Sequence, residues 1–173
     1  ELGQPLHSYN FDSIQGNIIL DINQKVSEFE TIHGKEILLK DDELIFLSNG
    51  KVINVAGIMG SKGTACSSDT SNVLIECASF KPEYIINKAT KLDINSDASH
   101  KFERGVDPLL HDLVLRRFIQ IVEDHTDIAD ISIYRKTYRK YENKIINIDF
   151  EILKKIIGFD AKKSICINIL ENL

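Results

Sequence analysis

The sequence predicts an α+β protein in which strands come first and helices follow. Residues 17–78 contain short apolar runs separated by turn residues, among them Asn49-Gly50. Residues 82–123 instead repeat apolar side chains at helical spacing. This order is typical of mixed or antiparallel β-sheets in the first half that are covered by helices. The C-terminal residues are then expected to begin a small helix-turn-helix-like domain.

Two hairpins are expected in the strand-rich part. Residues 42–58 form two strand-like runs around Asn49-Gly50, a dipeptide that favours a tight turn because both residues tolerate positive φ. Residues 30–39 show the same arrangement around His33-Gly34. A further extended run follows Gly16, over residues 17–21.

Residues 72–78, "NVLIECA", predict another strand with apolar side chains on both faces, as in a strand that is covered on both sides. Glu76 lies in this run, and a buried carboxylate is rare unless it has a partner. One interpretation is that Glu76 faces a pocket and accepts a hydrogen bond from a ligand. The alternatives are a pair with Lys or Arg in the core, or a strand end that reaches water.

Helices are expected to follow this strand. Pro82 suits the first turn of a helix that runs to about Leu92, and Asp107-Pro108 suits the start of a longer one. The apolar positions of the longer helix are expected to pack on the sheet. They are Leu110, Leu113, Val114, Phe118, Ile121 and Val122. Residues 127–136 predict a strand after it.

The composition changes at residues 134–144, where tyrosines alternate with arginine and lysine. Such a run can stack on RNA, although a solvated face or linker is the interpretation we favour. A strand over 144–149, a helix that ends at Gly158 and a second helix from Lys162 are expected next. Since these elements are too short to bury a core, we expect one domain over 1–140 and the truncated start of another over 141–173.

Charge and cysteine content exclude several classes of protein. The net charge is −5, so any contact with nucleic acid must be local. The three cysteines are widely spaced, which argues against a disulfide framework or a metal site and favours a reducing, cytoplasmic compartment. No apolar run approaches the roughly 20 residues of a membrane span, so no membrane partner is expected.

Two further runs are candidates for the wall of a pocket. Residues 56–63, "AGIMGSKG", contain three glycines, which permit a sharp bend or the close approach of a ligand; a plain turn is the alternative. Residues 96–108, "SDASHKFERGVDP", combine a capping Ser96 with a small Ala98; a helix–loop–helix corner is the alternative. His7 follows Pro5 in an expected loop, where a lone histidine is more often solvated than catalytic.

Four runs occur in an order that resembles the B3/B4 module of bacterial phenylalanyl-tRNA synthetase β subunits. They are "ELGQPLHSYN", "AGIMG", "SNVLIECASFKP" and "SDASHKFERGVDP". The resemblance covers residues 1–135, and the tail resembles the start of the following B5 domain. It implies an editing domain that hydrolyses tyrosine wrongly attached to tRNA(Phe), contacting the terminal adenosine and the tyrosyl ester.

The resemblance also implies a parent enzyme that charges tRNA(Phe) with phenylalanine. That enzyme uses ATP and Mg²⁺ and pairs the β subunit with an α subunit, whereas this segment is expected to need no cofactor of its own. Two other interpretations remain open. The chain is either a non-catalytic structural or tRNA-docking part of the subunit, or a freestanding amino-acid-binding editing module.

The resemblance carries over the family's pocket residues one at a time. His7 matches the histidine of "GQPxH", Gly60 the last glycine of "GIxG" and Glu76 the glutamate of "NxxLE". Ala98 matches the alanine of "TDAS", and Ser96 stands where threonine is usual. From the chemistry of these residues we expect Glu76 to accept the phenol hydroxyl and Gly60 and Ala98 to keep the pocket open. His7 and backbone amides near Gly60 are then expected to position the tRNA end and a water.

The chain departs from the family pattern at three places. Ser61 stands where a second glycine is usual, and residues 32–34 are "IHG" where "LDG" is usual. A family asparagine upstream of "ELGQP" would fall before Glu1, so the first strand is expected to be truncated. These departures bear on the affinity of the pocket for its substrate.

Overall fold

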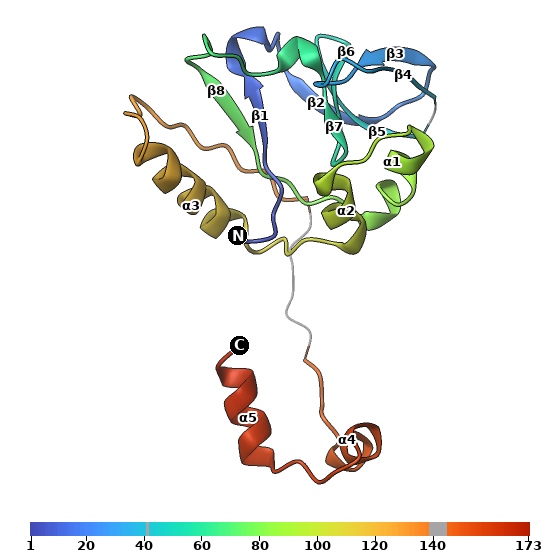
Figure 1. Cartoon of the computed structure of the whole chain (residues 1–173), viewed down its shortest axis with the longest axis vertical. Coiled ribbons are helices and arrows are strands. Elements are labelled where there is room, and N and C mark those ends of the chain that lie inside the picture. Colours follow the sequence, from blue (N-terminus) through green and yellow to red (C-terminus); the bar gives the residue numbers. More distant parts are fainter. Residues whose placement is uncertain (41, 139–144) are drawn as a thin grey trace. The chain divides into compact units, whose positions relative to one another are not determined.

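Antiparallel strand pairs dominate the first part of the chain in the computed structural model, which describes residues 1–40, 42–138 and 145–173. The chain divides into two units, Glu1–Ser132 and Ile133–Leu173 (Figure 1). All described strands lie in the first unit, together with three α-helices, whereas the second unit contains two helices. The α+β class is therefore confirmed.

The strands of the first unit form three antiparallel groups. A four-stranded sheet has the order β2 (Ile18–Ile22), β5 (Leu44–Ser48), β6 (Lys51–Val55) and β7 (Met59–Gly60). The two remaining groups are β3 (Ser27–Glu30) with β4 (Glu36–Leu39), and β1 (His7–Asn10) with β8 (Val73–Glu76). Short 3₁₀ turns, η1 (Phe11–Ser13) and η2 (Lys62–Thr64), follow β1 and β7.

Both predicted hairpins are confirmed. Asn49 and Gly50 connect β5 to β6 with φ angles of 48° and 74°, so both occupy the left-handed region that a tight hairpin turn of this kind requires. The β3–β4 hairpin closes where the Gly34 N–H donates to the carbonyl of Thr31, at 2.8 Å.

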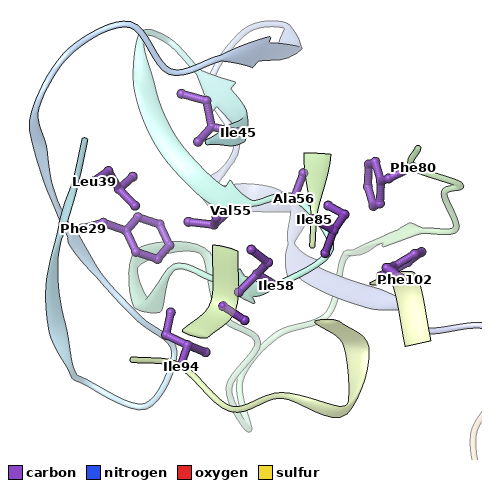
Figure 2. Close-up of a cluster of buried hydrophobic side chains, with 11 residues drawn as sticks. Phe29, Leu39, Ile45, Val55, Ala56, Ile58, Phe80, Ile85, Ile94 and Phe102 are labelled. Carbon is purple, nitrogen blue, oxygen red and sulfur yellow. The ribbon is translucent and has the colours of Figure 1, made fainter. Parts of the chain in front are cut away.

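The hydrophobic core joins the sheets to the segment that follows β8 (Figure 2). The buried residues of the sheets and their turns are Phe29, Leu39, Ile45, Val55, Ala56 and Ile58, and those of the later segment are Phe80, Ile85, Ala89, Ile94 and Phe102. The rings of Phe80 and Phe102 meet edge-on, with centroids 5.0 Å apart. This packing fixes the helix that carries Phe102 against the β6–β7 turn.

That helix, α2 (Asp97–Arg104), has well-defined ends. The Ser96 hydroxyl accepts a hydrogen bond from the Ser99 N–H (3.1 Å) and donates one to the carbonyl of Ile58 (2.8 Å). The first bond caps the helix, and the second ties its start to the turn between β6 and β7. Gly105, at φ 88°, ends the helix.

The predicted helix from Pro82 to Leu92 is wrong as a continuous element. A 3₁₀ turn, η3 (Pro82–Tyr84), and a single helical turn, α1 (Lys88–Lys91), replace it. Asn87 stands between them at φ 63°. Because a left-handed residue cannot continue a right-handed helix, the chain bends there.

The long helix, α3 (His111–Glu123), begins later than predicted. The Asp107 carboxylate accepts the Leu109 N–H at 2.8 Å and so holds a separate turn before the helix. The prediction that the apolar positions pack on the sheet is also wrong for several of them. Of these positions only Val114 is buried, whereas Leu113 and Ile121 are 52% and 40% exposed.

Both strands predicted near the C-terminal end are wrong. Residues 127–136 and 145–149 form neither helix nor strand, and Lys144 lies outside the described residues. A strand is stable only when its backbone N–H and C=O groups pair with a neighbour, and none of the described strands pairs with these segments. The pattern of apolar residues in these segments was therefore not enough to predict a strand.

The second unit contains the two predicted helices, α4 (Phe150–Ile157) and α5 (Lys163–Glu171). Asp149 caps α4 by accepting the Glu151 N–H at 2.8 Å, and Gly158 ends it at φ 84°, as predicted. Neither helix has a buried residue. Within the described residues, no helix is both long and apolar enough to cross a membrane.

The tyrosine-rich segment is only partly described. Tyr134 and Tyr138 are 85% and 81% exposed, and the Lys136 ammonium lies 5.3 Å from the centre of the Tyr138 ring. Residues 139–144 of the segment lie outside the described residues. The exposed tyrosines fit a solvated face or linker and RNA stacking equally well, so both interpretations stay predictions.

Gly57→Ala should destabilise the protein more than Gly34→Ala. Both glycines have positive φ, 71° and 78°, so both alanines would strain the backbone. Only at Gly57 would the added Cβ also lie 3.1 Å from core side chains, namely those of Phe80, Ile85 and Phe102. Urea unfolding should therefore give a difference of about 1–3 kcal/mol between the two variants. Equal decreases in the free energy of unfolding would show that the core side chains around residue 57 move to make room for the added methyl group.

Candidate functional site

A pocket of about 230 Å³ lies in the first unit, and all five predicted site residues line it. These residues are His7, Gly60, Glu76, Ser96 and Ala98. They come from β1, β7, β8 and the start of α2, which are far apart in the sequence. The structure therefore brings the five residues together, and the role of each stays a prediction.

Strand register places the polar side chains of the pocket on one face. β1 and β8 lie side by side (Figure 1), and their register places His7 directly opposite Glu76. Since side chains alternate along a strand, Tyr9 shares the face of His7 and Glu76. The Gln4 amide donates to the carbonyl of Ala78 at 2.8 Å and extends this pairing beyond the strand ends.

Glu76 receives its hydrogen bonds from two buried neutral groups. The Tyr9 hydroxyl donates to Glu76 Oε2 at 2.5 Å, and the Asn54 amide donates to the Tyr9 hydroxyl at 2.7 Å. The same amide lies 3.4 Å from Glu76 Oε2. Tyr9 and Asn54 are only 2% and 3% exposed, so water does not replace these partners. The structure thus gives Glu76 no Lys or Arg partner among the described residues, and the core ion pair is excluded there.

The predicted setting of Glu76 is partly wrong. Glu76 is the last residue of β8 rather than the middle of a strand that is covered on both sides, and Val73 of the same strand is 49% exposed. The carboxyl is buried because β1 and β6 supply its neighbours. Its surroundings are therefore set by tertiary contacts, which the strand pattern does not contain.

Sequence reasoning missed Tyr9 and Asn54. One signal for Tyr9 was available, because it stands two residues after His7 and shares its face if that segment is a strand. Asn54 interrupts the apolar run of β6, which is an equally visible but unspecific signal.

Burial sets the protonation of the polar groups. It raises the pKa of Glu76 from its usual 4.5 to about 7, while the hydrogen bond from Tyr9 acts in the opposite direction. Burial, and then the charge of Glu76, raises the pKa of Tyr9, which stays protonated and can only donate to the carboxylate. Burial also lowers the pKa of His7, which favours a neutral imidazole. The site therefore presents a carboxyl that titrates near neutral pH beside neutral donors.

Gly60 provides the space that His7 occupies. A Cβ atom built on Gly60 would overlap the imidazole atoms Cε1 and Nε2 of His7. The His7 ring also meets the Tyr9 ring edge-on, with centroids 4.4 Å apart. Glycine at position 60 thus permits the packing of His7, so the space directly above it is filled by the protein itself.

The start of α2 contributes another part of the pocket wall. Ala98 is half-buried against the core and contributes a single methyl group to the pocket. Ser96 donates its only hydroxyl hydrogen to Ile58, so this hydroxyl holds the wall in place and retains only acceptor capacity for a ligand. Phe102 of the same helix lines the pocket as well.

The β3–β4 turn forms the rim. The Ile32 N–H donates to the carbonyl of Gly60 at 2.8 Å, which fixes the turn against β7. His33 of the same turn is exposed and lines the outer part of the pocket. Across the ranges described, no group of three or more His, Cys, Asp or Glu side chains is placed to hold a metal ion.

This arrangement can bind a small ligand that has an apolar body and one hydroxyl group. The wall residues Ile58, Met59, Ala98 and Phe102 are apolar, and Glu76 supplies an acceptor among them. A volume of about 230 Å³ is below the roughly 300–1,000 Å³ of pockets for drug-sized molecules. The size suits a ligand such as a single amino acid.

A family model and the related proteins both point to the same family. The family model described as "B3/4 domain" matches residues 1–127. The phenylalanine–tRNA ligase β subunit of Protochlamydia amoebophila is 36% identical over 124 residues, which are 71% of this chain and 16% of that protein. The β subunit of Methylococcus capsulatus is 38% identical over 117 residues, 68% of this chain and 15% of that protein. The chain thus spans about 16% of the length of such relatives.

Glu76 should make the stability of the protein depend on pH. Its pKa is raised in the folded state, so folding is favoured by the bound proton and stability falls as pH rises from about 4.5 to about 7. A shift of this size corresponds to on the order of 3 kcal/mol. Urea unfolding between those pH values should show a fall in wild type that Glu76→Gln largely removes. Glu28→Gln, at an exposed position on β3, is the control. If the free energy of unfolding of Glu76→Gln fell with pH as steeply as that of wild type, Glu76 would not be the group responsible.

Proposed function

The chain belongs to the B3/4 domain family and is related to phenylalanine–tRNA ligase β subunits, and on that premise we propose that its pocket hydrolyses tyrosine wrongly attached to tRNA(Phe). The observation that carries the proposal is the half-buried Glu76, whose carboxyl has a pKa raised to about 7 by desolvation in an otherwise largely apolar pocket. Tyrosine and phenylalanine differ by one hydroxyl group. A buried acceptor is the feature that would distinguish them.

Glu76 reads the phenol hydroxyl in this proposal. Both of its hydrogen bonds within the described residues fall on Oε2, so Oε1 is available to a ligand. When phenylalanine enters instead, the acceptor is desolvated without a partner. Sites that hydrogen-bond a substrate hydroxyl reject the analogue that lacks it by about 10⁴–10⁵. Ala98 leaves room for the ring beside this acceptor.

The reaction is the hydrolysis of an ester. Water attacks the carbonyl carbon of the tyrosyl group, the bond to the terminal ribose oxygen of the tRNA breaks, and that oxygen takes up a proton. The pocket lining provides no activated nucleophile, because the hydroxyl hydrogen of Ser96 is donated to Ile58. Catalysis therefore rests on position: the neutral imidazole of His7 orients the tRNA end and the water at the carbonyl.

In this proposal the chain is part of a longer parent protein, which carries out the synthesis of Phe-tRNA(Phe). It is a cytoplasmic ligase that joins phenylalanine to tRNA(Phe) with ATP and Mg²⁺, and its β subunit assembles with an α subunit. Residues 1–140 are the editing domain, and residues 141–173 begin a B5-like domain.

A non-catalytic, tRNA-docking role is the second candidate. It is favoured by one observation: Tyr9 and His7 already occupy part of the space and hydrogen-bonding capacity around Glu76 and Gly60. In that case the chain would bind the tRNA end without accelerating loss of the ester.

Hydrolysis of Tyr-tRNA(Phe) by the chain tests the proposal. Wild type should release tyrosine faster than it releases phenylalanine from Phe-tRNA(Phe). Glu76→Gln should reduce the ratio of the two rates by tenfold or more, since the ionised acceptor is lost, about 1.4 kcal/mol or more. His7→Ala should slow both hydrolyses and leave their ratio unchanged. Glu28→Gln is the matched control.

Two outcomes would contradict the proposal. Absence of ester loss above the spontaneous rate would favour the docking role. A His7→Ala variant that began to hydrolyse Phe-tRNA(Phe) would show that His7 reads the side chain rather than positioning the reacting ester.

A further inference from the structure

Tyr9 is a buried phenol placed directly behind the carboxyl that reads the ligand in the proposed function. It does not line the pocket, yet its hydroxyl forms the shortest hydrogen bond to Glu76, at 2.5 Å to Oε2. Tyr9 is 2% exposed, so no water competes for this bond. A side chain in this place acts on the ligand only through Glu76.

We propose that Tyr9 is a positioning residue for substrate selection: it holds Oε2 of Glu76 away from the ligand and leaves Oε1 as the single acceptor for one hydroxyl group. The proposal rests on the proposed function for the identity of that hydroxyl. It goes further because it names a residue that does not contact the substrate, Tyr9, as the one that decides which oxygen of Glu76 accepts the substrate hydroxyl.

The direction of the hydrogen bond is fixed by Asn54. The Asn54 amide donates to the Tyr9 oxygen at 2.7 Å, so the phenol hydrogen is directed to Glu76. A phenol oxygen that accepts one hydrogen bond donates a stronger one, because hydrogen bonds in a chain polarise one another. Asn54 is 3% exposed and lies opposite Gly60, which has no side chain to displace it.

The position of the Tyr9 ring is fixed by His7. The two rings meet edge-on at 4.4 Å, and the His7 ring lies where a Cβ of Gly60 would otherwise be. His7 and Glu76 face each other across the β1–β8 pair, with Tyr9 next to His7 on the same face. Tyr9 thus links the group that positions the ester to the group that reads the side chain.

Few other groups influence the charge of Glu76. His7 and Tyr9 are its neighbours from β1, and Asn54 is its neighbour from β6. Cys77 follows it in the chain. The pKa of Cys77 is raised to about 11 by burial, and then by the charges of Glu76 and of Asp112 on α3. None of these is a cation near neutral pH, since burial lowers the pKa of His7. Donation from Tyr9 is therefore the main interaction that favours ionised Glu76.

Tyr9→Phe tests the proposal, because it keeps the ring and removes the hydroxyl. The ratio of kcat/KM for Tyr-tRNA(Phe) to that for Phe-tRNA(Phe) should fall about tenfold, the scale of a lost hydrogen bond to a charged group. The pH below which this ratio collapses should also rise, since Glu76 loses the donor that opposes its protonation. Tyr84→Phe, at a half-buried tyrosine outside the pocket, is the matched control.

A second measurement needs no substrate. The side-chain carboxyl of Glu76 is followed by ¹³C NMR during a pH titration of the whole chain, and its pKa should be higher in Tyr9→Phe than in wild type. Asn54→Ala should shift the pKa in the same direction by less, and it replaces Tyr9→Phe should that variant not fold. If the carboxyl shifts as expected but no variant hydrolyses either ester, the proposed function fails while the positioning of Glu76 by Tyr9 stands.

Two results would overturn the proposal. An unchanged selectivity ratio and an unchanged Glu76 titration in Tyr9→Phe would show that the hydroxyl serves only packing. Faster hydrolysis of Tyr-tRNA(Phe) by Tyr9→Phe would show that Tyr9 competes with the substrate for Glu76 rather than orienting it.

Discussion

The hydrogen bond between Tyr9 and Glu76 is the interaction on which the organisation of the site depends. A carboxyl buried beside apolar side chains is costly unless donors satisfy it. Glu76 meets this requirement with two neutral donors, Tyr9 and Asn54, and keeps a pKa near 7. Those donors come from β1 and β6, so both strands must lie close to the end of β8. The glycine at position 60 follows from this arrangement, because His7 packs beside Tyr9 and fills the space above residue 60.

The part of the pocket wall that α2 forms is held by the core. Phe80 and Phe102 pack edge-on and fix α2, while the Ser96 hydroxyl ties the first turn of that helix to Ile58. Since Phe102 belongs to both the core and the pocket lining, the width of the pocket depends on core packing. Ser96 and Phe102 thus have separate roles in the same helix: Ser96 caps its start, and Phe102 anchors it in the core.

Much of the fold and part of the site could be predicted from the sequence. Asn49-Gly50 and Gly158 require particular backbone angles, so the hairpin and the helix end were predicted correctly. Glu76 was visible as a carboxylate among apolar residues. Tyr9 and Asn54 were not predicted, because their importance arises from strand register and from contacts distant in sequence. The strands expected over 127–136 and 144–149 were predicted wrongly for a related reason. Apolar residues in the sequence indicate which side chains could be buried, whereas a strand forms only when its backbone pairs with a neighbouring strand.

In the proposed function, Glu76 accepts a hydrogen bond from the hydroxyl of a bound tyrosine side chain. Titration of the ¹⁵N-labelled chain with free tyrosine and, separately, with free phenylalanine tests this most directly by NMR. Tyrosine should bind more tightly than phenylalanine, with the largest shifts at Gly60, Glu76 and Ala98, and Glu76→Gln should lose that preference. Equal affinity for the two amino acids, or shifts located away from these residues, would contradict it.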